Sequence, residues 1–184
     1  MRLAVARERV YRVLAVRGEV SVSEIAREAG VSRRYVYRIL GELSSRGIVA
    51  LHPGKAVLID RKALVLTWGF MKRPILRKYS VVAYFYPEDI RGIVLFSGTV
   101  ALWILGRVLY PTMGTIYVHP EKTGELMEKR NPKGYPLRII IDEHIFKYKP
   151  VKIRGNFEIP FPEQFAADAV AEGLYGTEAL EYIR

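Results

Sequence analysis

Apolar residues recur at helical spacing in three successive segments at the start of the chain. From Leu3 to Arg17 they fall on one face of a helix, which Gly18 ends. The next two segments each place four apolar residues at relative positions 0, 3, 4 and 7, the core-facing stripe of an amphipathic helix. These residues are Val22, Ile25, Ala26 and Ala29, and then Val36, Ile39, Leu40 and Leu43.

Polar residues mark the ends of the second and third predicted helices. Ser21 and Glu24 have the spacing of a capping box, in which each side chain binds the other residue's exposed amide. Gly30 suits the left-handed position that follows a helix. Ser32 is a good N-cap for a third helix that continues to about Arg46.

A β-hairpin is predicted directly after the third helix. Residues 48–51 and 55–59 are short apolar runs, separated by the turn formers His52, Pro53 and Gly54. Three helices followed by a hairpin resemble a winged helix-turn-helix domain, and the stretch SVSEIAREAGVSRRYVYRILGELSSRGIV resembles that family along nearly its whole length. The resemblance implies that the third helix is the recognition helix and the hairpin is the wing.

The outer face of the third helix has the chemistry of a DNA-binding surface. Arginine can form two hydrogen bonds with guanine in the major groove, and tyrosine can bind phosphate or pack on sugar. We therefore predict DNA contacts from this helix, the wing and the basic segment that follows. The candidate residues are Ser32, Arg33, Arg34, Tyr35, Tyr37, Arg38, Lys55, Lys72 and Arg73. Protein binding stays an alternative, because some winged helices bind proteins.

Residues 61–80, RKALVLTWGFMKRPILRKYS, form a basic connector with six Lys or Arg and no acidic residue. Leu64, Leu66 and Trp68 alternate with other residues as they would in a strand. Two interpretations stay open. The segment is a second phosphate-contacting patch beside the wing, or a basic loop that packs Trp68 and Phe70 between two domains.

Short strands and helices are mixed after residue 80. Strands are predicted at 93–96, 115–118, 137–141 and 151–159, and helices at 99–106, 121–130, 165–174 and 177–183. This order predicts an α+β domain. The predicted organisation is therefore a winged helix-turn-helix at 1–60, the connector at 61–80 and an α+β domain at 81–184.

Two short motifs connect the last hundred residues with known families. FSGTVALWIL, followed by TIYV, resembles the nucleotidyltransferase core, in which a strand after the glycine turn carries two metal-binding carboxylates. Thr115 and Tyr117 stand at those positions and cannot bind magnesium as carboxylates do. Asp142 alone would be insufficient. The motifs therefore predict a nucleotidyltransferase-like domain that is not an enzyme.

The tail IPFPEQFAADAVAEGLY is similar to a segment of AbiEi-type antitoxin regulators, matching at Pro162, Glu163 and Asp168. The similarity implies an antitoxin-like regulator whose C-terminal domain helps to counter a partner nucleotidyltransferase toxin. We interpret Glu163 as a favourable charge at a helix N-terminus. Asp168 is interpreted as a solvated or locally paired helix residue.

The net charge of +10 lies almost entirely in the first eighty residues. Residues 1–60 hold eleven Lys or Arg and six Asp or Glu, a net +5; the connector adds +6; and residues 81–184 hold twelve and thirteen, a net −1. This distribution favours a polyanionic partner for the N-terminal part. The absence of cysteine, of a signal-peptide pattern and of an uninterrupted apolar span predicts a cytoplasmic protein without a membrane partner.

These features together predict a sequence-specific, DNA-binding transcriptional regulator, a repressor and antitoxin-like autoregulator. The partner is double-stranded DNA, and whether a toxin protein or a second copy also binds stays open. No catalytic residue, metal ligand or cofactor is predicted. Two alternatives remain: an antitoxin that acts mainly on a partner nucleotidyltransferase toxin, and an active nucleotidyltransferase with relocated carboxylates, such as Asp142 and Glu143.

Overall fold

The N-terminal part is a helix-turn-helix with a wing. A computed structural model describes residues 2–109 and 113–183. It begins with α1 (Arg2–Arg17), β1 (Glu19–Ser21), α2 (Val22–Ala29), α3 (Arg33–Ser44), β2 (Val49–His52) and β3 (Lys55–Leu58). The three strands form an antiparallel sheet in the order β1-β3-β2. The predicted helices and hairpin are confirmed, whereas the short strand β1 was not predicted.

Local sequence signals define these helices as expected. Ser21 and Glu24 form the complete capping box of α2, and Gly30 follows that helix in the left-handed conformation with φ 67°. The Ser32 side chain accepts a hydrogen bond from the Tyr35 amide at the start of α3. The residues of the two predicted apolar stripes are all buried.

The connector is a helix and not the predicted strand or loop. Helix α4 spans Arg61–Tyr79, and its N-cap Asp60 accepts a hydrogen bond from the Ala63 amide. Its buried residues include Leu64, Trp68, Lys72 and Leu76, which recur every four positions. The alternation around Leu66 suggested a strand. In the structure, the residues that recur every four positions are buried together on one side of the segment, which is the pattern of a helix.

The C-terminal part is built on a mixed sheet. Its strands are β4 (Val81–Phe85), β5 (Val94–Ser97), β6 (Gly114–Val118) and β7 (Tyr135–Ile141), in the order β4-β7-β6-β5. Only β6 and β7 are parallel. The α+β class is confirmed. Strand β4 was not predicted, and the predicted strand 151–159 is a hairpin of β8 (Val151–Ile153) and β9 (Phe157–Ile159), because Gly155 turns the chain with φ 76°.

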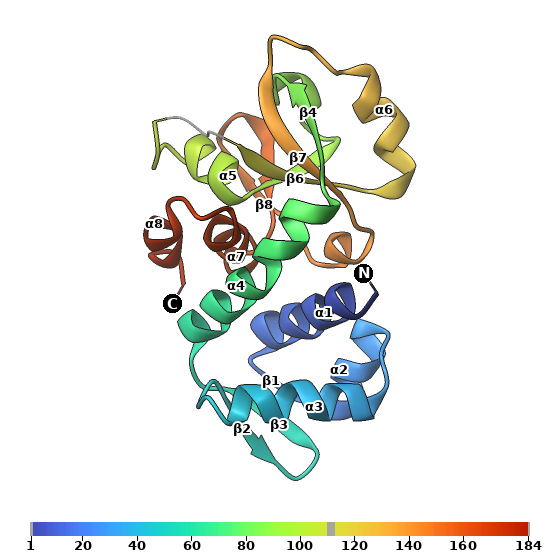
Figure 1. The fold of residues 1–184 in the computed structure, drawn as a ribbon, viewed down its shortest axis with the longest axis vertical. Coiled ribbons are helices and arrows are strands. Elements are labelled where there is room, and N and C mark those ends of the chain that lie inside the picture. Colours follow the sequence, from blue (N-terminus) through green and yellow to red (C-terminus); the bar gives the residue numbers. More distant parts are fainter. Residues whose placement is uncertain (1, 110–112, 184) are drawn as a thin grey trace.

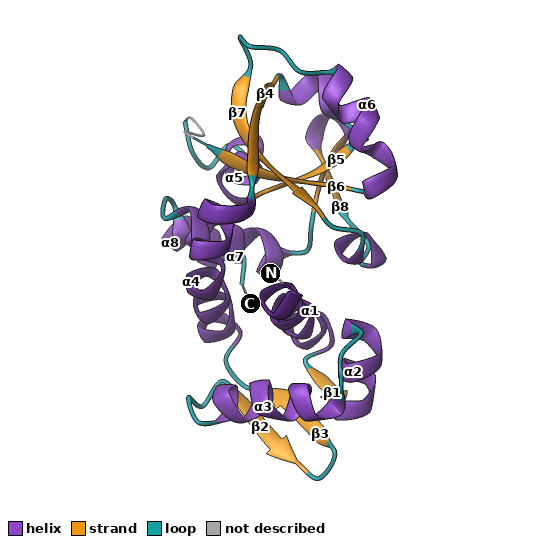
Figure 2. Ribbon diagram, turned by 45° about the vertical axis from the view of Figure 1, so that its right-hand side comes forward, coloured by secondary structure: helices purple, strands orange, loops and turns teal. Residues whose placement is uncertain are grey.

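Four helices accompany the sheet: α5 (Gly98–Ile104), α6 (Thr123–Glu128), α7 (Pro162–Glu172) and α8 (Gly176–Leu180). The winged helix lies at one end of the molecule and the sheet at the other, while α4 runs between them with α7 beside it (Figures 1 and 2). Helices α4 and α7 approach closely at Gly69, where a Cβ atom would come within 2.5 Å of the Val170 side chain. One apolar core extends from Val10 and Leu14 of α1, through Trp68 of α4, to the sheet.

Candidate nucleic-acid interface and a buried polar network

Helix α3 presents a basic face to solvent. Arg33, Arg34, Tyr37 and Arg38 are exposed, on the side of the helix opposite its buried residues. The tyrosine side chain is 52% exposed although it is aromatic. Burial in the protein core therefore does not explain this residue, and a face of this composition can meet a nucleic acid.

Two further candidates, Tyr35 and Ser32, lie at the N-terminal end of α3. The Arg38 guanidinium lies 4.8 Å from the centre of the half-buried Tyr35 ring. Ser32 is occupied by its capping bond to the Tyr35 amide, at 3.2 Å. Both residues orient the N-terminal turn of α3, which is the end that enters the major groove in helix-turn-helix proteins.

The wing and the connector supply fewer free cations than the sequence suggested. Lys55 at the start of β3 is exposed and forms a surface ion pair with Glu19 at 3.2 Å. Arg73 is half-buried, and its guanidinium donates to the Val170 carbonyl of α7 at 3.1 Å. Lys72 is 1% exposed. Its prediction as a surface phosphate contact is wrong, because its ammonium lies inside the protein among carboxylates.

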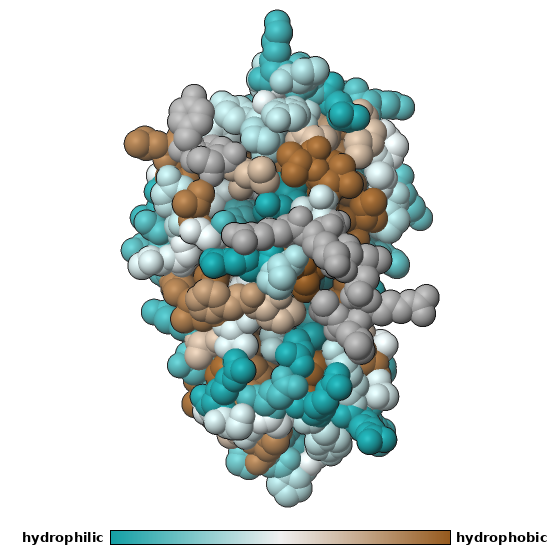
Figure 3. All heavy atoms as spheres, viewed as in Figure 1, coloured by the Kyte–Doolittle hydropathy of each residue, from teal (hydrophilic) through white to brown (hydrophobic). Residues whose placement is uncertain are grey.

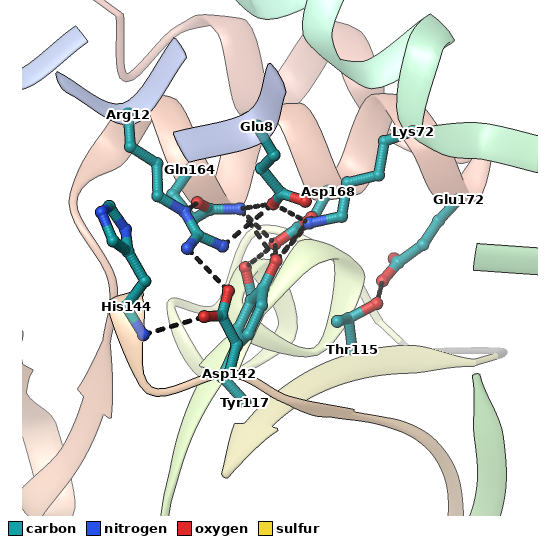
Figure 4. A network of polar contacts seen from close by, with 11 residues as sticks. Glu8, Arg12, Lys72, Thr115, Tyr117, Asp142, His144, Gln164, Asp168 and Glu172 are labelled. Carbon is teal, nitrogen blue, oxygen red and sulfur yellow. Dashed lines mark hydrogen bonds and ion pairs between the residues drawn. The ribbon is translucent and has the colours of Figure 1, made fainter. Parts of the chain in front are cut away.

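Lys72 is the centre of a buried polar network between α1, α4, α7 and the sheet (Figure 4). Its ammonium lies 2.6 Å from a carboxylate oxygen of Glu8 and 2.6 Å from one of Asp168, and it donates to the Tyr117 hydroxyl. Although burial lowers the pKa of Lys72, the charges of Asp168 and Glu8 hold it above its ordinary value. Lysine here is a structural cation.

Asp168 is saturated by hydrogen bonds. Besides Lys72, its carboxylate accepts from the Ser97 hydroxyl at 2.5 Å, from the Tyr117 hydroxyl at 2.9 Å and from Gln164 at 3.2 Å. The residue is fully buried. The predicted local pairing is present as the hydrogen bond from Gln164, four residues earlier in the same helix. The alternative prediction, a solvated Asp168, is wrong because four polar groups surround the carboxylate in the interior.

Arg12 of α1 connects the helix-turn-helix to the sheet. Its guanidinium lies 2.6 Å from Asp142, directly after β7, and 3.0 Å from Glu8. It also donates to Gln164 of α7 at 2.7 Å. Burial raises the pKa of Glu8, but Lys72 and Arg12 outweigh that effect and lower it to about 2. Glu8 therefore keeps its negative charge at neutral pH.

A second carboxylate occupies the Ser97–Gly98–Thr99 turn. Glu172 of α7 accepts from the Thr99 amide at 2.7 Å and from the Thr115 hydroxyl at 2.6 Å. A Cβ atom on Gly98 would lie 2.1 Å from the same carboxylate, so only glycine fits. Burial raises the pKa of Glu172 to about 7. Side chains of α7 therefore occupy the space beside this turn and bind Thr115 and Tyr117 of β6.

Other candidate charges have structural partners. Glu163 in the first turn of α7 forms an ion pair with Arg61 at 2.7 Å.

Among the residues that the structure describes, no group of three or more His, Asp or Glu side chains could hold a metal ion. No helix in the described ranges is long and apolar enough to cross a membrane.

The comparison with protein families decides the nature of the N-terminal part. Residues 6–82 match the family model described as "Sugar-specific transcriptional regulator TrmB". These residues are therefore similar to the winged helix domain of a family of transcriptional regulators. The match extends from α1 through the winged helix and all of α4 to the start of β4. No curated protein matches the chain.

The TrmB-type domain supplies part of the buried network. Glu8, Arg12 and Lys72 belong to it, whereas Tyr117, Asp142, Gln164 and Asp168 lie outside the match. Sequence analysis missed Glu8, Arg12, Tyr117 and Gln164 as members of a cluster. The four-residue spacing of Lys72 with Trp68 and Leu76 was a signal for its burial, but nothing in the sequence alone identified its distant partners.

Proposed function

We propose that this chain is a sequence-specific transcriptional regulator that inserts α3 into the major groove of double-stranded DNA. The observation that carries the proposal is the exposed face of Arg33, Arg34, Tyr37 and Arg38 within a TrmB-type domain. Arginine side chains on such a face can bind guanine edges, and Lys55 of the wing can bind phosphate.

Selection of bound sequences from a random DNA pool tests this function directly. The full chain should enrich one motif, and the Arg34→Ala variant should lose enrichment at specific positions while it still binds DNA. A matched variant at the exposed Lys62, which lies outside the recognition helix, should enrich the same motif as the parent. Recovery of unselected sequences by the parent chain would contradict the proposal.

We also propose that the regulator represses its own operon or a neighbouring gene. The support is the family match, which points to a transcriptional regulator. In the second part of the chain, Asp142 and Asp168 are held in ion pairs. Carboxylates in this state are not available to hold a metal, so the nucleotidyltransferase alternative gains no support. Footprinting on the DNA upstream of its own gene tests the repressor role, and protection should overlap a promoter.

The nucleotidyltransferase-like and AbiEi-like character of residues 81–184 stays a prediction, because the family match ends at residue 82. No comparison supports a partner toxin or a homodimer. Phosphate binding by Arg73 is not part of the proposal, because its guanidinium donates to the Val170 carbonyl.

A further inference from the structure

A cavity of about 510 Å³ lies where the winged helix meets the C-terminal part of the chain. One wall comes from Val16 and Arg17 at the end of α1 and from Glu28 in the last turn of α2. The other wall comes from residues 147–149, which follow β7, and from Phe161 directly before α7. The volume corresponds to roughly seventeen water molecules at about 30 Å³ each, enough for a small organic ligand.

Buried contacts hold the two walls against each other. His144, in the short 3₁₀ helix His144–Lys147, is 3% exposed, and its Nε2 donates to the Glu28 carbonyl at 2.9 Å. The Tyr148 ring lies edge-on to the His144 ring at 5.6 Å and to the Phe161 ring at 5.4 Å. The aromatic side of the cavity is therefore preformed, which lowers the cost of ordering side chains when a ligand binds.

Apolar surface faces this cavity from both walls. The surface of the winged helix is mostly hydrophilic in the view of Figure 3, where hydrophobic side chains gather over the sheet. Val16 is nevertheless 43% exposed, and Tyr148 and Phe161 across from it are only half-buried. An aromatic ring from a ligand can pack against such rings edge-to-face or with an offset.

The cavity also carries two cations without partners. Lys147 and Lys149 are exposed, and neither ammonium forms a hydrogen bond or ion pair within the described structure. The single carboxylate in the wall, that of Glu28, is already bound to Arg17 at 2.9 Å. All nineteen Asp and Glu side chains are described, so no other carboxylate lines this cavity. A ligand with a doubly charged phosphate would therefore meet two free ammonium groups.

The cavity lies away from the proposed DNA-binding face. Helix α3 turns its buried side toward α1 and α2 and its exposed arginines away from them. The C-terminal part, which supplies the second wall, lies on the other side of α1 (Figure 2). A duplex bound to α3 would not fill this cavity, whereas a small molecule would fit.

We propose that this cavity binds a small aromatic phosphate monoester, with its phosphate between Lys147 and Lys149 and its ring against Tyr148 and Phe161. Burial raises the pKa of Tyr148 to about 12, so its hydroxyl stays a proton donor at neutral pH. The ligand contacts α1 and α2 of the winged helix and the C-terminal part at once. Binding itself does not rest on the proposed DNA-binding function.

Calorimetric titration of the full chain at pH 7.5, in the absence of DNA, tests the site. The probe is 1-naphthyl phosphate, and the comparison compounds are inorganic phosphate, 1-naphthol and 1-naphthylmethylammonium. The probe should bind saturably with one molecule per chain, and the other three should bind at least about tenfold more weakly. Equal or tighter binding of any of the three, or no saturable binding of the probe up to about 1 mM, overturns the proposal.

A matched pair of double variants tests the place of the phosphate. Lys147→Gln with Lys149→Gln should weaken binding of 1-naphthyl phosphate by about tenfold or more. Lys129→Gln with Lys133→Gln removes the same charge from exposed residues that do not line the cavity, and should leave binding unchanged. Equal effects of the two double variants would show that the phosphate does not occupy this cavity.

A second pair tests the place of the ring. Val16→Glu adds a carboxylate to the wall and should weaken binding of the same probe by about tenfold or more. Val82→Glu is its control, because Val82 is exposed to a similar extent, 40%, and does not line the cavity. Parent-like binding by Val16→Glu would overturn the assignment.

The alternative source of phosphate is the DNA backbone, and salt dependence distinguishes it. The double variant at Lys147 and Lys149 should leave the slope of log DNA affinity against log salt unchanged. A slope flattened by about 0.9 for each lysine would assign these ammonium groups to DNA phosphates and overturn the proposal.

Discussion

Two groups of basic residues in the same N-terminal region have opposite environments. Arg34 and Arg38 lie exposed on α3, with no carboxylate partner within the described structure. Arg12 and Lys72, on α1 and α4, are buried and bound to carboxylates of α1, α7 and the chain after β7. Both groups add to the positive charge of the first eighty residues, but only the exposed group can interact with DNA. The net charge of a segment therefore overestimates its electrostatic field wherever its cations are paired inside.

The difference also assigns the two groups to different tasks. A buried ion network that joins two parts of a chain fixes their relative position, because breaking one pair leaves an uncompensated charge. An exposed arginine contributes little to stability. Stability should therefore respond to the buried group, and DNA affinity to the exposed group.

The largest effect is expected from Lys72→Met. Removal of the ammonium leaves Glu8 and Asp168 without their common cation, and should lower the free energy of unfolding by about 3–5 kcal/mol. Urea denaturation measures this change. Lys62→Met on the exposed side of the same helix is the matched control and should change stability by less than about 0.5 kcal/mol. Similar losses in the two variants would contradict the structural role of Lys72.

Glu172 should make stability fall as the pH rises toward neutrality. The folded protein holds the proton of Glu172 up to a pKa of about 7, whereas the unfolded chain releases it near 4.5. Between these values the native state binds more protons, so the free energy of unfolding decreases with increasing pH, by up to roughly 3 kcal/mol, and the effect is complete above pH 7.

The measurement compares denaturation of the parent and of Glu172→Gln from pH 4.5 to 8. The difference between them should follow this decrease, while the exposed Glu128→Gln should behave like the parent. A pH-independent difference would show that Glu172 is ionised throughout.

Arg34→Ala and Arg38→Ala should reduce affinity for the preferred DNA site by roughly 1–3 kcal/mol and relax base preference at the positions they contact. Their unfolding free energies should be nearly unchanged, in contrast to Lys72→Met. Fluorescence-based titrations on the preferred and an unrelated DNA sequence provide the measurement. Parent-like binding by both variants would mean that α3 does not contact the bases.

The smallest effect concerns Lys55 in the wing. Lys55→Ala should weaken binding about equally on all sequences and flatten the slope of log affinity against log salt by about 0.9, the loss of one phosphate contact. Arg73→Ala should leave the slope unchanged, because the structure places this guanidinium on the Val170 carbonyl. A flatter slope for Arg73→Ala would instead extend the DNA interface to α4.

Local sequence determined the helix-turn-helix and its candidate interface. Caps such as Ser21 and Ser32 act within three residues, and the apolar stripes of α2 and α3 act within eight, so a linear pattern contains the necessary information. The same is true of the exposed arginines, since a helix with one apolar face must present its other side to solvent. The strand positions of Thr115 and Tyr117 were also evident from a short apolar run.

Only the tertiary structure decided which charges are paired and what fills the turn at Gly98. Lys72 and Asp168 are separated by almost a hundred residues, and Arg12 and Asp142 by more, yet each pair lies within ion-pair distance. The tertiary structure also decided that residues 61–79 form a helix. The side of this helix that is buried is the side that packs on α7 and α1, and the alternation of apolar residues in the segment did not indicate it. The energy of a buried charge depends on the groups around it, and those groups come together only when the whole chain folds.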